Sequence, residues 1–580
     1  MKLLRRWFTW PRAVAACALL PAILLGMWGF YIDLTSSGRS DTGSPWFWLS
    51  ILYSTLQLFV MEFNVQNDKI PFPWQLHVAR LLAALFLGLA IWETLSRLFH
   101  DQWLEWRLSR LKGHAIVCGL GRRGALLVHG LLARKFAVVA IEVSETNEHL
   151  AGCVARGAIV LIGDAKEAAL LARAGISRAA FMLIASESDR VNLEIALRAK
   201  ELAATRSQLR ERLLKCLVHV SQWEVAEVFR QHRILTSPDQ NFDAQLLSYF
   251  EESARLALAA APLDVSPPRH VRLVVADFSP MGEAVVLQAL RIGHFPGGRG
   301  MEIVVLDAQA PEREREFLIR YPQAANAGTV RFLPQSLEDA ETRRQLMNWA
   351  ADDQTHLAIA ICQDDDILSL ALAISLPEKV LEQPTTVYIW QNQPQNLDQI
   401  LSGGRAGGAR FVPLGAEEPG ASAALVLEDR LDRLAKAIHD DYVLGRRADG
   451  SHNPADASHQ EWSYLNQGFR NSSRAQADHM EVKLRAVHCR RVRSAGAERK
   501  VTVFTPEEVE LLAEMEHARW CAERFLAGWT LGTPKDKARK ISPDLVPWRD
   551  LPEPIREYDR QAVRRLPEHL ALLGEEIERL

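Results

Sequence analysis

The chain has 580 residues, of which 48% are hydrophobic and 24% are charged, so it is long enough to form several globular domains. Its formal net charge of −3 argues against a general nucleic-acid-binding protein, so we expect no nucleic-acid partner. The seven cysteines are scattered without a C-x-x-C pair, which indicates reduced thiols in a cytosolic body rather than a disulfide framework or a zinc site.

Two apolar stretches near the start have the length of membrane-spanning helices. Residues 13–32 carry no charge, and residues 76–98 carry Arg80 near one end and Glu93 near the other. These two charges either snorkel toward opposite interfaces or face a water-filled path. The first stretch is long and no A-x-A site follows it, which favours a retained anchor over a cleaved signal peptide. Basic residues on the outer flanks of both stretches predict a multi-pass protein of a bacterial inner membrane, embedded in the lipid bilayer with both termini in the cytoplasm.

Residues 46–63, between these stretches, are apolar as well. A third full crossing would place the large C-terminal part outside the cell, against the charge bias, so we predict a re-entrant or interfacial segment. The order of span, dipping segment and span resembles two-span potassium channels with a cytosolic regulatory ring. Those channels carry T-V-G-Y-G after the pore helix, whereas residues 56–62 contain no glycine, so potassium selectivity is not supported. The alternative is a hairpin that anchors a sensor and conducts nothing.

The stretch 116–127 predicts a buried strand, a tight glycine turn and the start of a helix. Gly119, Gly121 and Gly124 form a G-x-G-x-x-G, in which the first glycine permits the turn, the second lets backbone approach a pyrophosphate and the third lets the helix pack on the strand. Glu142 ends the next apolar run, 23 residues after Gly119, where this fingerprint places a carboxylate for ribose hydroxyls. The stretch therefore predicts a nucleotide site, with the alternative that the glycines serve packing only.

Strand and helix patterns alternate from residue 114 to about 203, which predicts a parallel, doubly wound sheet. Motifs around Asp164, Gly175, Asp189 and Asn192 follow the glycine loop at a spacing that resembles the TrkA N-terminal (RCK) domains of potassium-transport regulators. The resemblance implies a ligand that is NAD(H) or an adenine nucleotide, ATP or ADP. The implied ligand residues are Gly119, Gly121, Gly124, Glu142 and Asp164, and Arg122 and Arg123 inside the loop either meet phosphate charge or are solvated.

The same strand and helix pattern returns in the second half of the chain. Residues 270–282 align with the first glycine turn, but Asp277 and Ser279 replace the first two glycines and only Gly282 remains. An aspartate at that position would repel a pyrophosphate, so we predict a structural copy that binds no nucleotide. Neither half contains a G-x-S-x-G elbow, an H-E-x-x-H pair or a P-loop, so we predict no catalytic residues, no metal site and no enzyme.

Near the C-terminus, Thr505, Pro506 and Glu508 predict a capped helix that continues through residues 511–524, and Ser473 with Gln476 predicts an earlier cap. The helix sequence MEHARWCAERFLAGW and the loop sequence PDLVPW resemble the Ry repeat of ryanodine receptors, over about residues 430–575. The resemblance implies a helical module for interaction or ligand binding. We predict a second ligand site formed by Arg519, Arg524 and Trp548, while Trp520 fits plain core packing.

Together these patterns predict two α/β Rossmann-like domains with doubly wound parallel sheets, an N-terminal transmembrane helical hairpin and a C-terminal α-helical module. The predicted domains are 1–112, 113–262, 266–425 and 426–580. The predicted function is a nucleotide-responsive ion channel or ion-transport regulator, with a cytosolic gating ring formed by a homodimer or homotetramer. The alternatives are a non-conducting, membrane-anchored nucleotide sensor that signals through the Ry-like module, and an NAD-linked oxidoreductase, which the missing catalytic residues disfavour.

Overall fold

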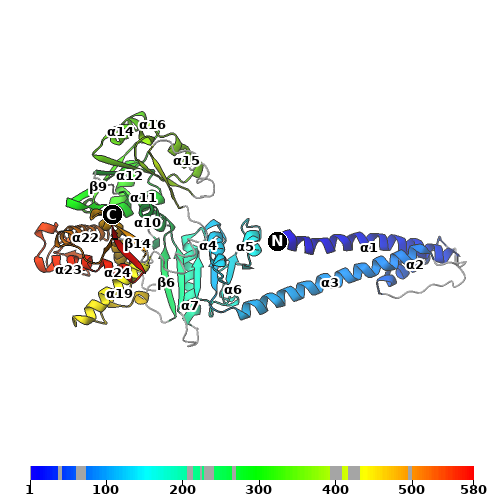
Figure 1. Cartoon of the computed structure of the whole chain (residues 1–580). Coiled ribbons are helices and arrows are strands. Elements are labelled where there is room, and N and C mark those ends of the chain that lie inside the picture. Colours follow the sequence, from blue (N-terminus) through cyan, green and yellow to red (C-terminus); the bar gives the residue numbers. More distant parts are fainter. Residues whose placement is uncertain are drawn as a thin grey trace.

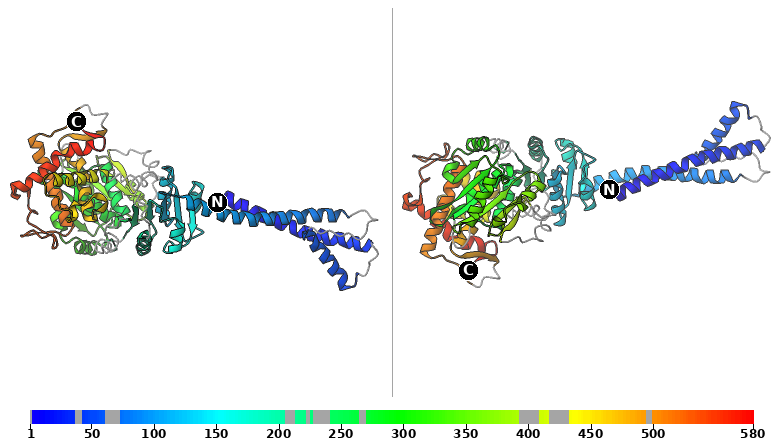
Figure 2. Two further views of the ribbon diagram at one scale, coloured as in Figure 1. Left: turned by 90° about the horizontal axis from the view of Figure 1, so that it is seen from below. Right: turned by 90° about the horizontal axis from the view of Figure 1, so that it is seen from above.

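The computed structural model shows a long helical arm joined to a body of two α/β domains and a C-terminal region (Figures 1 and 2). The arm projects from the first α/β domain, and the second α/β domain and the C-terminal region lie on the other side of that domain. The residues that the structure describes are 2–36, 42–60, 73–204, 213–221, 225–226, 241–263, 270–391, 408–415, 432–493 and 499–580.

The arm is built from three helices and a short turn, which are α1 (Lys2–Ser36), α2 (Pro45–Gln57), η1 (Leu58–Val60) and α3 (Trp74–Arg110). α1 and α3 pack side by side (Figure 1). Within them, Cys17–Ser36 and Trp74–Trp92 are long and apolar enough to cross a membrane, by length and composition. Only 39% and 22% of these two windows are buried inside the protein, so most of their apolar surface faces outward.

Glycines on α1 allow it to approach the other helices of the arm closely. A Cβ atom at Gly29 would lie 2.5 Å from Leu76 Cγ on α3, and one at Gly26 would lie 2.8 Å from Thr55 Cγ2 on α2. Because lipid provides no hydrophobic drive for helices to associate, close packing of this kind is what holds membrane helices together. The predicted re-entrant segment is helical through η1, and its end at residues 61–63 lies outside the described residues.

The first sheet is parallel throughout and has the strand order β3-β2-β1-β4-β5-β6. Its elements are β1 (Ala115–Cys118), α4 (Arg122–Ala133), β2 (Val138–Glu142), α5 (Leu150–Ala155), β3 (Ile159–Ile162), α6 (Ala168–Arg173), β4 (Phe181–Ile184), α7 (Asp189–Ala204), β5 (Leu214–His219) and β6 (Phe242–Leu247). Every residue of β1 is buried, as a strand covered by helices on both faces requires. The predicted doubly wound sheet is confirmed.

The second domain repeats this topology. Its elements are β7 (His270–Ala276), α11 (Pro280–Ile292), β8 (His294–Phe295), η2 (Pro296–Gly298), β9 (Arg299–Leu306), α12 (Ala310–Arg320), α13 (Ala324–Ala327), β10 (Thr329–Leu333), α14 (Ala340–Ala351), β11 (Thr355–Ile361), α15 (Asp366–Ile374), α16 (Glu378–Leu381), β12 (Thr386–Trp390) and β13 (Arg410–Leu414). The parallel order β10-β9-β7-β11-β12-β13 matches the first sheet strand for strand. The helix α10 (Tyr249–Ala260) joins the two domains.

The C-terminal region is mainly helical, as predicted, and also contains a small antiparallel sheet of order β14-β18-β15. Its elements are α19 (Arg433–Ala448), η4 (Ala457–His459), η5 (Trp462–Tyr464), α20 (Gln467–Asp478), α21 (Met480–Ala486), β14 (Cys489–Arg493), β15 (Lys500–Val501), α22 (Pro506–Leu526), β16 (Thr530–Leu531), β17 (Ile541–Ser542), η6 (Trp548–Asp550), α23 (Glu553–Arg564), α24 (Leu566–Ala571) and β18 (Glu575–Arg579). The hydrophobic core of this region is continuous with one face of the second domain.

Candidate functional site

The glycine loop lies between β1 and α4, and its three glycines have different surroundings. Gly119 has a φ of +89°, so it turns the chain in a conformation that side chains disfavour. A Cβ atom at Gly124 would lie 1.9 Å from the carbonyl oxygen of Gly119, so this position has room for glycine only. Gly121 is the N-cap of α4, and no described atom lies within 4 Å of a Cβ placed there. Gly119 and Gly124 therefore shape the loop, while Gly121 leaves space above it open.

The loop sits where the strand order of the first sheet reverses. β1 pairs with β2 on one side and with β4 on the other, so the chains leaving β1 and β4 turn to opposite faces of the sheet. This arrangement creates a crevice at the carboxyl ends of the strands, where α/β proteins of this kind bind ligands. The N-terminus of α4 faces the crevice with free backbone N–H groups and the positive end of the helix dipole, which suit a phosphate.

Glu142 lies beside the glycine loop at the end of β2. One carboxylate oxygen accepts a hydrogen bond of 2.6 Å from the backbone N–H of Leu120, and the other accepts one of 3.0 Å from Ser144. Asp164 follows β3, and the N–H of Gly163 before it donates to the carbonyl of Glu142 at 2.9 Å. The carboxylate of Asp164 accepts from the backbone of Lys166 and pairs with the Lys166 ammonium at 3.3 Å. The structure thus brings the loop, Glu142 and Asp164 together at the carboxyl ends of the parallel strands.

The two arginines of the loop differ. Both lie on the first turn of α4 and are half-buried. The Arg123 guanidinium lies 4.8 Å from the ring centre of Tyr249 and 5.4 Å from that of Phe250, and it contacts the His219 imidazole. Burial lowers the pKa of Arg123 from its usual value, and the nearby Asp189 acts in the opposite direction. Arg123 therefore points toward α10, whereas the sequence reasoning offered only phosphate contact or solvation.

The wall of the crevice opposite the glycine loop includes residues that the sequence reasoning did not assign to the site. The side chain of Asn192 is buried and accepts from the N–H of Ser186 (3.0 Å), while donating to the His219 carbonyl at 3.0 Å. The backbone of Ser186 would lie 3.0 Å from a Cβ at Gly119. Ser186 comes shortly after the end of a predicted strand, which is the signal that could have identified it.

The corresponding loop of the second domain is closed by its own side chains. Asp277 adopts a φ of +75° where the first domain has Gly119, and a Cβ at Gly282 would lie 2.2 Å from its carbonyl oxygen. The Ser279 hydroxyl caps α11 and donates to the Cys362 carbonyl at 2.6 Å. Burial, together with the carboxylates of Asp307 and Asp364, raises the pKa of Asp277 to about 6. At neutral pH this loop is acidic, which disfavours a phosphate.

Arg519 is not available to a ligand, which corrects the predicted second site. Its side chain is 2% exposed and is paired with the carboxylates of Glu516 at 2.7 Å and Glu523 at 2.8 Å. The indole N–H of Trp548 donates to Glu510 at 3.1 Å. A buried guanidinium with two carboxylate partners stabilises the helix bundle, and withdrawing it to bind a ligand would leave those charges unpaired.

Arg524 and Trp548 lie at opposite ends of one row of side chains along α22. His517 lies 5.8 Å from Trp548 on one side and 5.8 Å from Trp520 on the other, as ring centres. The Arg524 guanidinium lies 5.6 Å from the Trp520 ring and 5.1 Å from the Trp529 ring. The three predicted residues therefore do not converge, and the half-buried Arg524 ends the row between Trp520 and Trp529.

Comparison with known proteins matches residues 115–232 to the TrkA-N domain and residues 501–579 to the RyR domain. An uncharacterized protein of Methanothermus fervidus is 33% identical over 122 residues, a match that covers 21% of this chain and 18% of that relative. The GsuK channel bound to NAD is 13% identical with a TM-score of 0.39, over 75% of this chain and 86% of that one. GsuK bound to ADP is 15% identical with a TM-score of 0.37, over 72% and 98%. This chain therefore contains a TrkA-N domain, which carries the glycine loop, and a C-terminal RyR domain.

Proposed function

We propose that this protein is a nucleotide-responsive regulator of ion movement across a bacterial inner membrane, acting as a channel or within a transporter, and that it is not an enzyme. The observation that carries the proposal is the open space above Gly121 in the crevice where the first sheet reverses its strand order. Backbone can approach a pyrophosphate there, at the N-terminus of a helix. The TrkA-N match over the same residues supports this reading.

The proposed ligand is NAD(H), ADP or ATP. Gly119, Gly121 and Gly124 would hold the phosphates, with Arg122 beside them on the first turn of α4. The carboxylate of Glu142 would accept hydrogen bonds from ribose hydroxyls after exchanging its bond to the Leu120 N–H. The same carboxylate would repel the 2′-phosphate of NADP(H). NAD and ADP are the nucleotides named for the bound GsuK channels, and are the first to test.

The helix α3 provides a mechanical connection from the candidate span to the TrkA-N domain. It continues without a break for 37 residues, a length of roughly 55 Å at 1.5 Å per residue. Arg178 donates to the carbonyls of Leu108 and Leu111 at 3.2 Å, and Arg173 pairs with Glu105 at 2.6 Å. A rigid displacement of the TrkA-N domain would therefore move the membrane end of α3. A nucleotide can drive that displacement only through a difference in its affinity for the two positions.

We further propose that several copies form the working unit. The described part of a single chain offers two candidate spans and one short helix, too few to enclose a pore. Closed symmetric rings are the usual solution, so we propose a homodimer or a homotetramer whose cytoplasmic domains form the regulatory ring. Residues 54–64 contain no glycine to present carbonyl groups as a potassium filter does, so conduction should discriminate poorly between potassium and sodium.

The experiment is ion flux through the purified full-length protein in liposomes, measured with potassium and with sodium. NAD(H), ADP or ATP should change the ion flux through the wild type and should not change the ion flux through Gly121→Asp. An ion flux through the wild type that is the same with and without each nucleotide would contradict nucleotide control. Nucleotide binding without any flux would support the second candidate function, a non-conducting sensor anchored in the membrane that signals through the RyR domain.

A specific observation favours a further ligand site on the RyR domain. The Arg524 guanidinium lies between two indole rings, and its Nε has no hydrogen-bond partner among the described residues. The loop that follows carries the exposed Lys540, whose Nζ would lie 3.9 Å from a Cβ placed at Gly528, the residue before Trp529. Guanidinium and indole side by side suit the ring and phosphate of a nucleotide or an anionic group of a partner protein. Arg524→Gln should weaken binding of ATP to this site in the Gly121→Asp background, where the first site is removed.

A further inference from the structure

The helix α10 touches all three parts of the body. It follows β6, the edge strand of the first sheet, and Ser248 caps its start by accepting from the Glu251 N–H. From there it packs on α11, and its apolar face joins the core shared by the second domain and the RyR domain through Ala254, Ala257 and Leu258. A movement of α10 would therefore displace side chains in the cores of both of those domains.

The first turn of α10 is held by the glycine loop on one side. Arg123 comes two residues after Gly121, and its guanidinium lies over the rings of Tyr249 and Phe250, at 4.8 and 5.4 Å from their centres. Its side chain reaches past β4 to His219 at the end of β5. The guanidinium thus lies across the same crevice that the N-terminus of α4 faces.

The second domain holds the other side of the same turn. The Tyr249 hydroxyl donates to the Gly415 carbonyl at 2.6 Å. The ring centres of Tyr249 and Phe250 lie 5.8 and 5.7 Å from that of Trp390, the last residue of β12. Trp390 is 1% exposed, so these contacts belong to the core of the second domain. One pair of aromatic rings therefore lies between the glycine loop and the second sheet.

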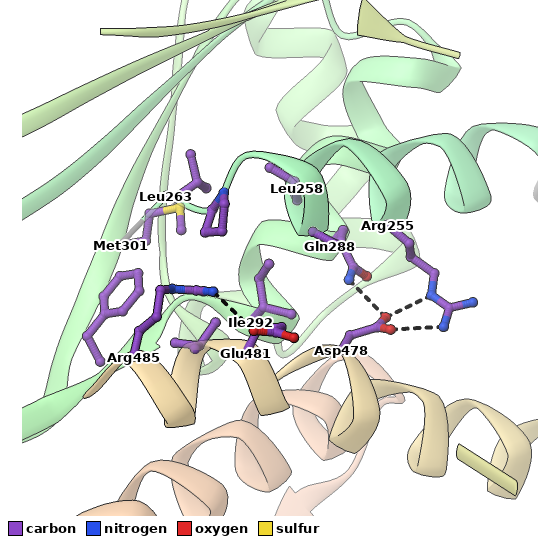
Figure 3. Close-up of a pocket in the computed structure, with 13 residues that line it drawn as sticks. Arg255, Leu258, Leu263, Gln288, Ile292, Met301, Asp478, Glu481 and Arg485 are labelled. Carbon is purple, nitrogen blue, oxygen red and sulfur yellow. Dashed lines mark hydrogen bonds and ion pairs between the residues drawn. The ribbon is translucent and has the colours of Figure 1, made fainter. Parts of the chain in front are cut away.

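The middle of α10 is held to the C-terminal region by charge. Arg255 donates to both carboxylate oxygens of Asp478, at 2.7 and 2.9 Å, and Gln288 donates to the same carboxylate at 3.0 Å (Figure 3). Arg255 also pairs with Glu252 and lies 3.9 Å from Asp432. Its side chain is 7% exposed, so breaking this bidentate contact would leave buried charges unpaired. A displacement of α10 should therefore also displace Asp478, at the end of α20.

We propose that Arg123 is the residue that couples the glycine loop to α10, because a nucleotide phosphate in the loop and the Tyr249–Phe250 ring pair compete for its guanidinium. The inference rests on the proposed nucleotide site and states how binding at that site is transmitted to the rest of the protein. A phosphate offers a charge-assisted, bidentate hydrogen bond, which is stronger than a cation–π contact at a half-buried position. Withdrawal of Arg123 removes the contact that holds the first turn of α10 to the glycine loop, and the contacts of Arg255 and Tyr249 carry the change to the C-terminal region and the second domain.

The first test follows hydrogen exchange of full-length protein in detergent, with and without saturating ADP or NAD. In the wild type, nucleotide should increase exchange in peptides from residues 249–260 and 467–486. In Arg123→Gln at saturating nucleotide this increase should vanish, while Arg134→Gln, an arginine at the opposite end of α4 from the glycine loop, should keep it. An unchanged increase in Arg123→Gln would overturn the coupling role. Failure of the wild type to bind either nucleotide would instead overturn the proposed function.

The second test changes the aromatic rings that compete with the phosphate for Arg123, and it leaves the glycine loop unaltered. Replacing both rings, in Tyr249→Leu/Phe250→Leu, removes the competitor for Arg123. ADP should then bind roughly two- to thirtyfold more tightly, the range that corresponds to cation–π contacts. Tyr249→Phe keeps the ring and loses only the hydroxyl bond to Gly415, so its ADP affinity should equal that of the wild type. Equal or weaker ADP binding by the double variant, measured on protein with wild-type secondary structure, would overturn the competition.

Discussion

The three glycines of the first loop provide a matched pair of substitutions that separates folding from ligand binding. Gly124→Ala places a methyl group 1.9 Å from the Gly119 carbonyl oxygen, a backbone atom that no rotamer change can move. Gly121→Ala places the same methyl group where no described atom lies within 4 Å, and at φ −56° and ψ 176° the backbone accepts any side chain. The two variants differ by position alone.

The geometry sets the size of each effect. Overpacking against a fixed atom costs about 1–3 kcal/mol, and a backbone collision belongs at the upper end, about 3 kcal/mol for Gly124→Ala. For a domain of this size that corresponds to a fall in Tm of roughly 6–12 °C. Gly121→Ala should not lower the Tm, because removing the freedom of glycine at a compatible position is neutral or stabilises by about 0.4–1 kcal/mol. Its methyl group fills the space for a pyrophosphate, so affinity for ADP should fall roughly tenfold or more.

Thermal unfolding and calorimetric titration with ADP, both on the full-length protein in one detergent, measure the two effects. The reasoning is refuted if Gly121→Ala lowers the Tm as much as Gly124→Ala does, because Gly121 would then be a packing residue. It is equally refuted if Gly121→Ala binds ADP with the affinity of the wild type.

Three further predictions concern other parts of the molecule. Titration of Arg524→Gln should give one nucleotide per chain and the double variant Gly121→Asp/Arg524→Gln none, since Asp277, Asp307 and Ser279 close the second loop; a second equivalent in Arg524→Gln would contradict that assignment. Gly29→Leu should destabilise the arm by about 1–3 kcal/mol against Leu76, whereas Gly88→Leu, with no described atom within 4 Å of its Cβ, should not. Although burial lowers it, the bond to Asp559 raises the pKa of His517 to about 10, above its usual value of about 6.5. The stabilisation from His517 is therefore fully present below about pH 6.5 and lost toward pH 10, and the difference in Tm between wild type and His517→Gln should shrink over that interval.

The sequence predicted elements best where local chemistry and the tertiary fold agree. Thr505, Pro506 and Glu508 predicted the start of α22, and the structure has the complete capping box there. The helix predicted to start after the glycine turn is α4, which begins at Arg122. The cap predicted at Ser473 is wrong, because α20 begins at Gln467 and its N-cap is Asn466, whose side chain accepts from the Phe469 N–H. Serine followed three residues later by glutamine is a short pattern, and here Ser473 lies inside the helix that Asn466 caps.

The candidate site was harder to predict from the sequence than the fold, because the partners of its side chains come from elements that are distant in the chain. The G-x-G-x-x-G predicted three glycines, but the backbone had to be seen to know that Gly121 alone leaves open space. Arg123 was predicted either to meet a phosphate or to be solvated, and its contact with α10 depends on how two domains pack. Arg519 was predicted to be part of a ligand site, whereas its guanidinium is taken up by carboxylates about one turn away on either side of it. Local patterns predict backbone geometry, whereas the partner of a long charged side chain is decided by tertiary contacts.

The most direct test of the central claim is calorimetric titration of the full-length protein with NAD(H), ADP and ATP beside NADP(H). The account predicts that at least one of the first three binds, and that it binds more tightly than NADP(H), because the Glu142 carboxylate lies at the edge of the glycine loop and would repel a 2′-phosphate. Gly121→Asp should abolish binding at the glycine loop while the protein stays folded, and any binding left should be removed by adding Arg524→Gln. Tighter binding of NADP(H), or unchanged affinity in Gly121→Asp, would contradict the claim that this loop is the nucleotide site.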